Sequence, residues 1–576
     1  MLNFYDFEVF SEDWLVVIIN LYEKTETVIV NDKKTLEEYY EAHKNEIWVG
    51  YNNNHYDQYI MKAILCDFNP KEVNDFIIAK GKYGWQYSSL FRKIQMYNYD
   101  VMYRNDRGLK SLEGFMGNDI KETSVPFDID RKLTPDELSE TIKYCKHDVE
   151  QTIEVFFERK SDFDAQMGLI RMFDLPLNNI SRTKAQLSAI ILEAQRPRDS
   201  RDDEFDISFP PTMKIEKYTE VVDWYKDVNN RDYSKSLTTT VAGVETLFGW
   251  GGIHSAVPKY HGEGLFINMD VASLYPSLMI QYNLLSRNIK DPQKYIDIYH
   301  NRLKYKAEKN PLQLPLKTLL NSTYGCFKDK NNALYDPLMA NNICIFGQLL
   351  LLDLIEKLEP YADIIQSNTD GILIKMPDKV PGSYLKNAED VWFEVIDDIV
   401  YEWEQRTRLK MEFDEYRKVF QKDVNNYIVV TPDGKYKSKG SYVKKQNSLD
   451  YDLPIVNKAM IEYMTKNVPV EVTINNCNEL VMFQKIVKLT GKFKNAIHNG
   501  KILDEKCFRV FASIDKSDSY IGKQKQKGAT IEKFANTPEH CFIVNTDVKE
   551  MKVPKKLNKS WYIELTKERL RQFGVM

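Results

Sequence analysis

A charged, proline-bearing segment at residues 195–211, QRPRDSRDDEFDISFPP, is the feature that most constrains how this chain folds. It has no hydrophobic periodicity, so no helix or strand is expected to cross it, as is typical of a domain boundary. About 190 residues precede it, a usual size for one domain. The 576 residues together are enough for about three or four domains.

Strand patterns open the chain. Residues 3–10, 14–21 and 27–30 are rich in Val, Ile and Phe and are separated by polar turns, which predicts an antiparallel meander. Residues 47–51 form a further extended run. A long helix is expected to begin at Thr134, because Thr-Pro-Asp-Glu combines a capping box with proline at the first helical position.

The second part of the chain mixes the same kinds of element. Residues 264–271 read as a buried strand, and residues 304–327 as helical stretches interrupted near Pro311 and Pro315. Asn-Thr-Asp-Gly at 368–371 and Thr-Pro-Asp-Gly at 431–434 are strong turn sequences between short apolar runs, which predicts two hairpins. The fold class expected is therefore α/β and multidomain.

The composition excludes several classes of protein. With 43% hydrophobic and 28% charged residues the chain is neither disordered nor collagen-like. Its longest apolar stretch, 343–355, is broken by Gln348 and Asp353 and is shorter than the roughly 18 to 20 apolar residues of a membrane span. The first residues lack the basic and hydrophobic segments of a secretory signal, so we expect a cytoplasmic protein with no membrane association.

The cysteines indicate neither disulfides nor a structural zinc site. There are seven, scattered along the chain and never in a C-x-x-C pair. We expect buried, reduced thiols.

Positive charge is concentrated towards the C-terminus, although the chain carries 79 basic against 84 acidic residues. Residues 415–445 hold eight basic and three acidic residues, and residues 485–533 hold twelve and five. A run of lysines of this kind suits contact with nucleic-acid phosphates, but a solvated lysine-rich surface explains the segment equally well.

Acidic residues in the first part form three ordered groups. Asp6 and Glu8 are two apart on a strand, so both project from one face. Asp57 ends the run N-N-H-Y-D, and Asp148 lies four residues after Tyr144 on one helix. Converging carboxylates need cations, and Mg²⁺ prefers oxygen ligands, so a two-metal site for phosphodiester hydrolysis is indicated, with a phenol beside the attacking water. The alternative is a set of solvated carboxylates.

The order D-x-E, N-x-x-(F/Y)-D and Y-x-x-x-D resembles the three motifs of DnaQ-like 3′-5′ proofreading exonucleases. The resemblance implies that Asp6, Glu8, Asp57 and Asp148 hold the metals and that Tyr144 assists the water. It also implies that Asn53 and Tyr56 hold the terminal nucleotides.

A second constellation lies beyond residue 260. Asp270 ends an apolar strand and Asp370 lies in the 368–371 turn, a placement that suits two Mg²⁺ ions in phosphoryl transfer. Between them, a cation, an amide and an aromatic ring share one helical stripe, and two further cations lie upstream at i and i+4. Fixed positive charge suits a triphosphate. These five residues are Lys317, Asn321, Tyr324, Arg302 and Lys306.

The motifs D-x-x-S-L-Y-P, K-x-x-x-N-S-x-Y-G and T-D-G, in this order after an exonuclease-like segment, resemble a family B DNA polymerase of the compact phage type. The resemblance spans residues 6 to about 440. It implies metal binding by Asp270, Asp370 and the Val271 carbonyl, and exclusion of a 2′-hydroxyl by Tyr275. The three cations would bind the triphosphate, and Asn321 and Tyr324 would line the nascent base pair.

Three departures from the family pattern limit this resemblance. Asn368 stands where the hairpin usually carries its first Asp. The usual K-x-Y near the primer terminus is Asn425-Asn426-Tyr427, so Tyr427 keeps the ring, and Lys439, with Lys435 and Lys437 nearby, is the candidate for the missing charge. The intervals from Asp270 to Lys317 and from Tyr324 to Asp370 span 47 and 46 positions, too short for the insertions of protein-primed polymerases. A segment FGWGG at 248–252 resembles the family's Y-x-G-G link, without its tyrosine.

We therefore expect a DNA-dependent DNA polymerase with proofreading, using two Mg²⁺, or alternatively Mn²⁺, at each site. The domains expected are an RNase H-like exonuclease at 1–194, a template-side connecting segment at 195–260, a palm at 261–445 with fingers inserted at about 285–325, and a thumb with DNA-binding function at 446–576. The thumb would contact duplex phosphates through lysines 485, 488, 492, 494, 523, 525 and 527. Partners would be primer-template DNA, dNTPs and phage replication proteins, and the chain would act as a monomer. Two alternatives stay open: a DNA nuclease with a non-catalytic DNA-gripping C-terminal half, and, because of Asn368, a non-catalytic replication scaffold.

Overall fold

The structure is a computed structural model that describes residues 1–197, 201–377 and 388–576. Two compact units emerge from its contacts. The first contains Met1–Arg182, Gln446–Ile455 and Ile474–Ile563, and the second contains Thr183–Lys445, Val456–Thr473 and Glu564–Met576. The predicted 446–576 segment is thus divided between both units, and part of the predicted boundary at 195–211 lies outside the described residues.

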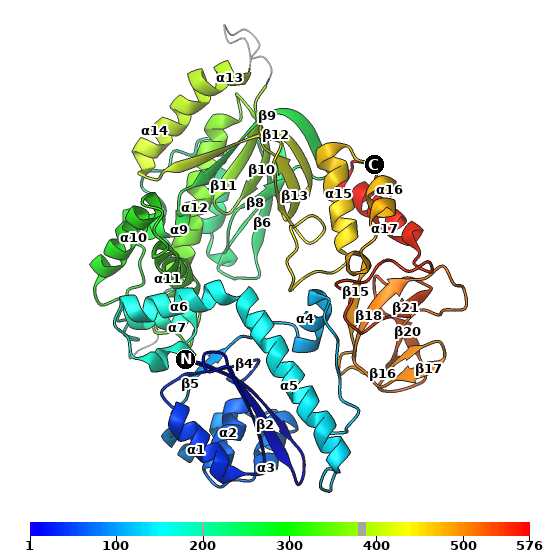
Figure 1. Cartoon of the computed structure of the whole chain (residues 1–576). Helices are drawn as coiled ribbons and strands as arrows, with labels where there is room; N and C mark the ends of the chain where they lie inside the picture. The colour runs from blue at the N-terminus through cyan, green and yellow to red at the C-terminus, as the bar shows by residue number, and fades with distance from the viewer. Residues whose placement is uncertain (198–200, 378–387) are drawn as a thin grey trace. The chain divides into compact units, whose positions relative to one another are not determined.

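A five-stranded sheet forms the centre of the first unit, with the order β3-β2-β1-β4-β5 (Figure 1). The meander β1–β2–β3 is antiparallel, as predicted, while β4 and β5 join β1 in parallel. The strands are β1 (Leu2–Val9), β2 (Trp14–Asn20), β3 (Thr25–Val30), β4 (Ile47–Gly50) and β5 (Tyr97–Asp100). The helices of this part of the chain are α1 (Lys33–His43), α2 (Asp57–Leu65), α3 (Pro70–Ile78), α4 (Leu109–Met116), α5 (Pro135–Glu158) and α6 (Lys160–Met172), of which α2, α3 and α5 pack on β1.

Helix α5 begins as the sequence predicts. The Thr134 hydroxyl accepts a hydrogen bond from the Glu137 backbone N–H, and the Glu137 carboxylate accepts one from the Thr134 N–H at 2.8 Å. Pro135 occupies the first turn, where its missing N–H costs nothing. This cap fixes where α5 starts and hence which of its residues face β1 and β2, its packing partners.

The C-terminal part of the first unit contains two small sheets. One has the order β15-β18-β21 and the other the order β17-β16-β19-β20. Their strands are β15 (Lys485–Lys488), β16 (Phe493–His498), β17 (Lys501–Leu503), β18 (Cys507–Ala512), β19 (Gly522–Lys525), β20 (Ile531–Lys533) and β21 (Cys541–Ile543). Of the predicted phosphate-binding lysines here, Lys485 pairs with Asp452 at 2.6 Å and Lys525 with Glu532 at 2.7 Å.

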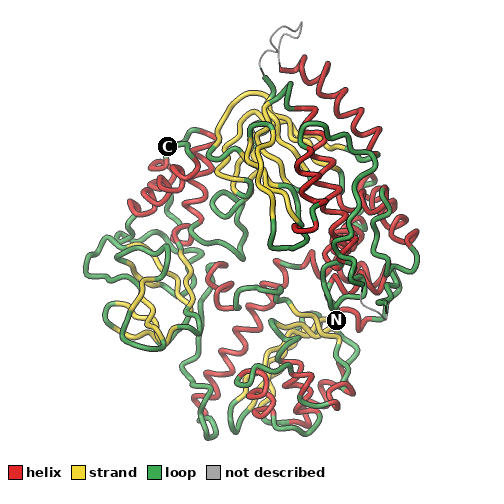
Figure 2. The backbone as a smooth tube through the Cα atoms, turned by 180° about the vertical axis from the view of Figure 1, so that it is seen from behind, coloured by secondary structure: helices red, strands yellow, loops and turns green. Residues whose placement is uncertain are grey.

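A nine-stranded antiparallel sheet organises the second unit, in the order β14-β13-β12-β9-β11-β10-β8-β7-β6. Figure 2 shows helices beside this sheet. The strands are β6 (Ser236–Val241), β7 (Val244–Gly249), β8 (His254–Ala256), β9 (Tyr260–Val271), β10 (Asp363–Asn368), β11 (Gly371–Lys375), β12 (Met411–Asp423), β13 (Asn426–Val430) and β14 (Tyr436–Lys439). Both predicted hairpins are confirmed, as β10–β11 and β13–β14.

The helices of the second unit correct two predictions. They are α7 (Lys184–Ile191), α8 (Thr219–Lys226), α9 (Leu274–Gln281), α10 (Pro292–Ala307), α11 (Gln313–Cys326), α12 (Pro337–Leu358), α13 (Ala388–Val391) and α14 (Asp397–Thr407). Only Pro311 separates helices, because Pro315 lies in the first turn of α11, where proline is tolerated. Helix α7, predicted to lie in the first domain, packs on α11, and Ser188 Oγ lies 2.7 Å from Ser322 Oγ. The last helices, α15 (Pro454–Lys466), α16 (Val470–Asn476) and α17 (Lys559–Phe573), contain residues of both units.

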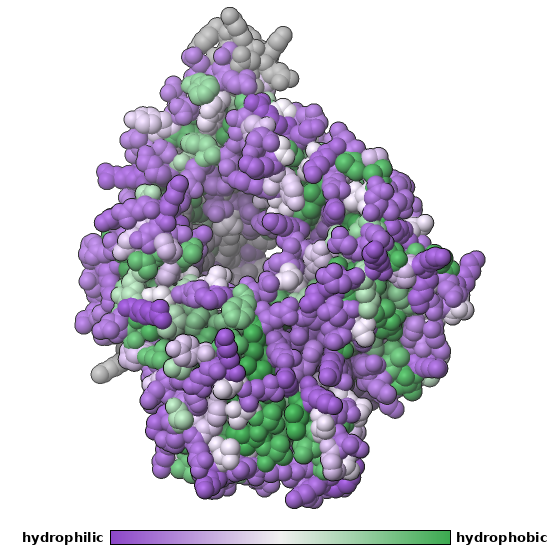
Figure 3. All heavy atoms as spheres, viewed as in Figure 1, coloured by the Kyte–Doolittle hydropathy of each residue, from purple (hydrophilic) through white to green (hydrophobic). Residues whose placement is uncertain are grey.

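Helix α12 is longer than the apolar stretch seen in the sequence, and by length and composition alone it could cross a membrane. It is instead 94% buried within the chain over its most apolar window, as a core helix is. The apolar stretch 343–355 is thus part of a helix long enough to cross a membrane, contrary to the prediction made from the length of the stretch. Figure 3 shows mostly hydrophilic side chains on the face it displays.

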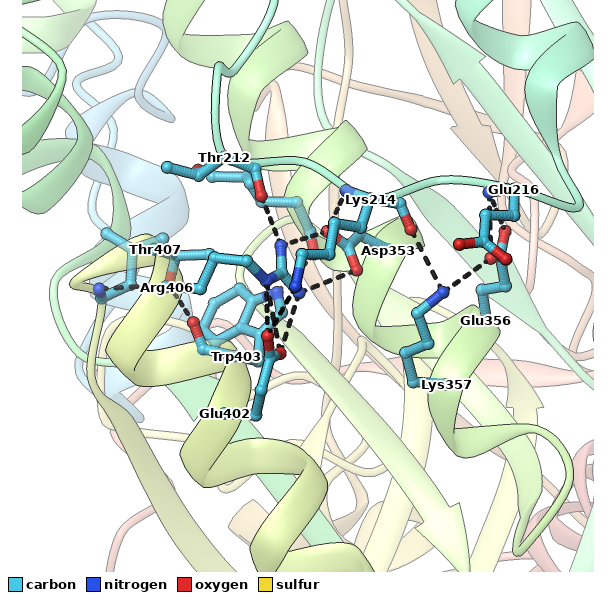
Figure 4. Close-up of polar contacts among 12 residues, drawn as sticks. Thr212, Lys214, Glu216, Asp353, Glu356, Lys357, Glu402, Trp403, Arg406 and Thr407 are labelled. Carbon is cyan, nitrogen blue, oxygen red and sulfur yellow. Dashed lines mark hydrogen bonds and ion pairs between the residues drawn. The ribbon is translucent and has the colours of Figure 1, made fainter.

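Polar side chains within α12 are satisfied by neighbouring segments (Figure 4). Asp353 is fully buried and accepts two hydrogen bonds from Arg406 of α14, at 2.7 and 3.1 Å, and one from the Lys214 N–H at 2.7 Å. Glu356 accepts the N–H groups of Glu216 and Lys217 at 3.0 and 2.9 Å. A buried carboxylate with such partners avoids most of its desolvation cost, so these residues fasten the 212–218 segment to α12.

All seven cysteines are free, and five are buried as expected, the exceptions being the half-buried Cys66 and Cys477.

Candidate active sites

The four predicted carboxylates of the first unit come from three elements. Asp6 and Glu8 lie on β1, Asp57 is the first residue of α2, and Asp148 lies on α5. The Phe7 N–H of β1 donates to Asp57 Oδ1 at 3.1 Å, which ties α2 to the strand between the two acids. Carboxylate oxygens of Asp6 and Glu8 and the sulfur of Cys145 all lie within 4.8 Å of one another.

Burial and mutual repulsion make this cluster reluctant to carry its full charge. Burial first, then the neighbouring carboxylates, raise the pKa of Asp6 and of Glu8 well above the ordinary values. Burial raises the pKa of Asp57 to about 7 and that of Asp148 to about 6. Asp6 and Glu8 offer neighbouring oxygen ligands of the kind that a hard divalent cation prefers, and the charges of Asp57 and Asp148 act on both, so the residues fit the predicted metal.

A lysine next to Asp148 was not predicted from the sequence. Lys110 of α4 forms an ion pair with Asp148 and a second one with Glu113 at 3.0 Å. Glu113 is fully buried, and its Oε2 lies 3.5 Å from His147 Nε2. The ring of Tyr144 lies 4.5 Å from Lys110 Nζ, and burial, with Asp148 next in effect, raises the pKa of Tyr144. No motif in the sequence pairs α4 with α5, so tertiary packing alone reveals Lys110.

Asn53 and Tyr56, predicted to hold nucleotides, make hydrogen bonds within the unit. Asn53 is fully buried, and its amide donates to Asn98 Oδ1 at 3.0 Å and to the Tyr99 carbonyl at 3.2 Å. Its Oδ1 has no partner among the described residues. The Tyr56 hydroxyl donates to Asn74 Oδ1 at 2.8 Å. Their role towards nucleotides stays a prediction.

In the second unit, Asp270 and Asp370 meet at the end of the β9–β11 pair. Asp270 is opposite Gly371 in register, and the Val271 N–H donates to the Asp370 carbonyl at 2.7 Å. A Cβ at Gly371 would lie 1.9 Å from Asp270 Oδ1, so glycine is needed beside the carboxylate. Asp270, Val271 and Asp370 all line one cavity of about 610 Å³.

Burial and a neighbouring carboxylate disfavour the charged form of Asp270, as they do for the acids of the first unit. Burial, then the charge of Asp370, raises the pKa of Asp270 to about 6. Asn268 donates to Asp270 Oδ2 at 2.6 Å and orients it. The oxygens of two carboxylates and a backbone carbonyl again form a donor set suited to divalent cations.

The three predicted triphosphate cations line the same cavity. Arg302 and Lys306 come from α10 and Lys317 from α11. Arg302 is 9% exposed and donates to Ser273 Oγ at 3.0 Å, while its Nε has no hydrogen-bond partner among the described residues. Lys306 pairs with Glu412 at 3.1 Å. Asp270 and Asp370 therefore line the same cavity as these three cations.

The aromatic candidates divide into two groups. Tyr427 of β13 lines the cavity, whereas Tyr275 and Tyr324 lie outside its described lining and contact each other, with ring centroids 4.2 Å apart and ring planes tilted by 41°. The Tyr324 hydroxyl lies 2.7 Å from the sulfur of Cys344 on α12. Asn321 lies on the exposed side of α11. These three do not belong to the described cavity lining.

Two acidic residues of the cavity were not predicted from the sequence, whereas Lys437 was expected to supply positive charge beside Lys439. Glu412 and Asp414 lie on β12, which pairs with β9 so that Glu412 is opposite Asp270. Lys437 of β14 lines the cavity and pairs with Asp414 at 2.7 Å. The predicted Lys439 is opposite Tyr427 in register but lies outside the described lining. Alternating acids at 412 and 414 were the available sequence signal.

The 248–252 segment approaches the turn that carries Asp370. A Cβ at Gly252 would lie 2.5 Å from Thr369 Oγ1, so the segment touches the turn that carries Asp370. Gln348 of α12 holds the segment by donating to the carbonyls of Gly249 and Gly251 at 2.8 and 2.6 Å.

Comparison with known proteins finds partial similarity to archaeal polymerases. The chain is 25% identical over 300 residues to the protein named DNA polymerase 1 of Saccharolobus solfataricus, covering 43% of this chain and 32% of that protein. It is 24% identical over 255 residues to DNA polymerase 1 of Sulfolobus acidocaldarius, covering 42% of this chain and 25% of that protein. The matched part is thus a third or less of these relatives' length. No protein-family model matches the chain.

Proposed function

We propose that the chain is a DNA-dependent DNA polymerase with a 3′-5′ proofreading exonuclease. The observation that carries the proposal is the single cavity that Asp270 and Asp370 line together with Arg302, Lys306 and Lys317. A nucleotidyl transfer needs that combination: acids for divalent cations and fixed positive charge for a triphosphate. The similarity to proteins named DNA polymerase 1 supports the same conclusion.

Under this proposal the nine-stranded sheet is the palm of a right-hand arrangement of family B, and α10 and α11 belong to the fingers. The first unit has a five-stranded sheet with the order β3-β2-β1-β4-β5 and acids on β1, which supports an RNase H-like exonuclease there. The compact phage type rests on the sequence motifs and their order alone.

Two divalent ions, held by Asp270, Asp370 and the Val271 carbonyl, would stabilise the attacking and leaving oxygens of the transfer. Lys317 and Lys306 would bind phosphate oxygens of the incoming dNTP, and Arg302 would donate to the same group through its unpartnered Nε. Tyr275, whose ring lies against that of Tyr324, would contact the sugar and exclude a 2′-hydroxyl.

In the exonuclease site, Asp6, Glu8, Asp57 and Asp148 would hold the ions that activate a water against the terminal phosphodiester. Lys110 already neutralises part of the charge of Asp148. Tyr144, beside Lys110, would orient the water through its hydroxyl, which burial keeps protonated by raising its pKa.

Primer extension and degradation on one labelled primer-template test the proposal. The wild type should add nucleotides when dNTPs and Mg²⁺ are present and shorten the primer when dNTPs are omitted. Asp370→Asn should abolish addition and leave shortening intact, and Asp6→Ala with Glu8→Ala should do the opposite. A protein that only shortens the primer would be the nuclease alternative, and synthesis that persists in Asp370→Asn would refute the assignment of the cavity.

A further inference from the structure

Two aromatic side chains project side by side from the segment between α3 and β5 of the first unit. Tyr83 is 61% exposed and Trp85 is 56% exposed. Their ring centroids lie 6.2 Å apart, with an angle of 16° between the ring planes. Large aromatic rings are usually buried, so two nearly parallel exposed rings indicate a surface that binds something.

The turn that carries these rings is fixed to the core of the unit. Gly84, between them, is buried, and a Cβ there would lie 2.3 Å from the Tyr59 ring, so only glycine allows this approach. The Tyr83 N–H donates to Gln86 Oε1 at 3.2 Å. Tyr59 packs in turn near Phe91, with centroids 6.0 Å apart. The two exposed rings are therefore held in place before any ligand binds, which lowers the entropic cost of binding.

The charge around the rings has one sign. No Asp or Glu occurs from residue 76 to residue 99, in a chain that is acidic overall. The same interval contains the exposed cations Lys80, Lys82, Arg92 and Lys93, none of which forms an ion pair within the described parts of the chain.

The nearest acids, on the preceding helix α3, are already bound. Asp75 pairs with Lys71 at 2.7 Å, and Glu72 accepts a hydrogen bond from the Tyr87 hydroxyl at 3.1 Å. The surface around the rings therefore presents net positive charge.

We propose that Tyr83, Trp85 and these four cations form a binding platform for single-stranded DNA. Stacking requires free base faces, which a single strand offers and a duplex conceals, and cations beside stacking rings are how single strands are bound without sequence preference. The cations beside the rings favour a polyanionic strand over an apolar protein surface. The identification of the bound strand as DNA rests on the proposed function. The stacking of bases on the two rings does not depend on that function.

The platform is joined to the proposed exonuclease site through α2. Tyr59, against which Gly84 packs, is two residues after Asp57 in that helix. A strand held by Tyr83 and Trp85 would thus be bound on the same unit that trims it.

Fluorescence anisotropy of a labelled oligo(dT) of about 20 nucleotides, with the full chain in EDTA so that nothing is degraded, tests the platform. Trp85→Ala should weaken binding about tenfold, because stacking contributes about 1–3 kcal/mol per base. Trp85→Phe should retain most of the affinity. Tyr22→Ala is the matched control, since Tyr22 is 74% exposed in the same unit and should change nothing. Duplex DNA of the same length should be insensitive to Trp85→Ala.

Photo-crosslinking with 5-iodouracil in the oligonucleotide locates the contact directly. Trypsin cleaves after Lys82 and after Arg92 and so releases residues 83–92 as one peptide. This peptide should carry the crosslink. Unchanged affinity in Trp85→Ala together with crosslinks elsewhere would overturn the proposal. If Trp85→Ala lost binding to anionic phosphatidylglycerol vesicles but kept its affinity for oligo(dT), the surface would be a membrane-binding one, and the proposal would also be overturned.

These measurements are independent of catalysis. A chain whose platform binds but which neither extends nor shortens a primer would refute the proposed function and leave the platform standing. A chain that extends and shortens primers normally while Trp85→Ala binds oligo(dT) like the wild type would refute the platform alone.

Discussion

Asp57→Asn should stabilise the metal-free protein at pH 8. Burial raises the pKa of Asp57 to about 7, against about 3.9 in an unfolded chain. The folded state therefore prefers the protonated carboxyl. The charge lowers the free energy of unfolding; this cost is absent well below pH 4 and grows as the pH rises to 7. A difference of about 3 pKa units corresponds to about 4 kcal/mol at pH 8, falling to about 1.5 kcal/mol at pH 5. Asparagine removes the charge but keeps an oxygen for the Phe7 N–H, now 3.1 Å away.

Thermal unfolding midpoints in EDTA at pH 8 and pH 5 measure this effect. The unfolding midpoint of Asp57→Asn should exceed that of the wild type at pH 8. The difference between the two midpoints should be much smaller at pH 5. Added Mg²⁺ at pH 8 should narrow or reverse the difference, because only the wild type keeps the full ligand set and gains binding free energy. Asp128→Asn, which changes an exposed carboxyl, is the control and should show no such pH dependence. A lower midpoint for Asp57→Asn at pH 8 in EDTA would refute the reasoning.

Three further substitutions test other contacts. Arg406→Ala leaves the buried Asp353 without its partner and should cost about 3–5 kcal/mol, read as a lower urea midpoint, with recovery when Asp353→Leu is added. An unchanged midpoint would contradict this. Gly252→Ala should push the turn at Thr369 and slow primer extension but not primer degradation; an equal loss of both activities would instead indicate misfolding. Lys317→Gln should raise the KM for dNTPs about tenfold, since a hydrogen bond to a charged group contributes about 1.5–3 kcal/mol, and an unchanged KM would exclude Lys317 from triphosphate binding.

Local signals in the sequence were sufficient for the elements whose ends they determine. The capping box at Thr134 and the two Asp-Gly turns each fix a helix start or a hairpin by contacts within a few residues. Pro315 was misinterpreted because a proline in the first turn and one that breaks a helix look alike until the helix start is known. Helix α7 was assigned to the wrong part of the chain because its partner, α11, is more than a hundred residues away.

The candidate sites show the same division. Asp270 and Asp370 were found because strand ends and turns carry recognisable patterns, and they line one cavity. Lys110 was missed because only the packing of distant segments pairs it with Asp148. Lysines are common, so it did not stand out in the sequence.

Each carboxylate cluster is only partly neutralised by its own unit. Lys110 pairs with Asp148 in the first, and Lys437 pairs with Asp414 in the second, yet burial and repulsion still raise the pKa of Asp57 to about 7 and that of Asp270 to about 6. Such carboxylates lower the stability of the free protein at neutral pH, and a divalent cation relieves that cost when it binds. The acids that weaken the metal-free fold are therefore the same groups that would give the proposed enzyme its affinity for metal, and stability and catalysis should rise together as Mg²⁺ is added.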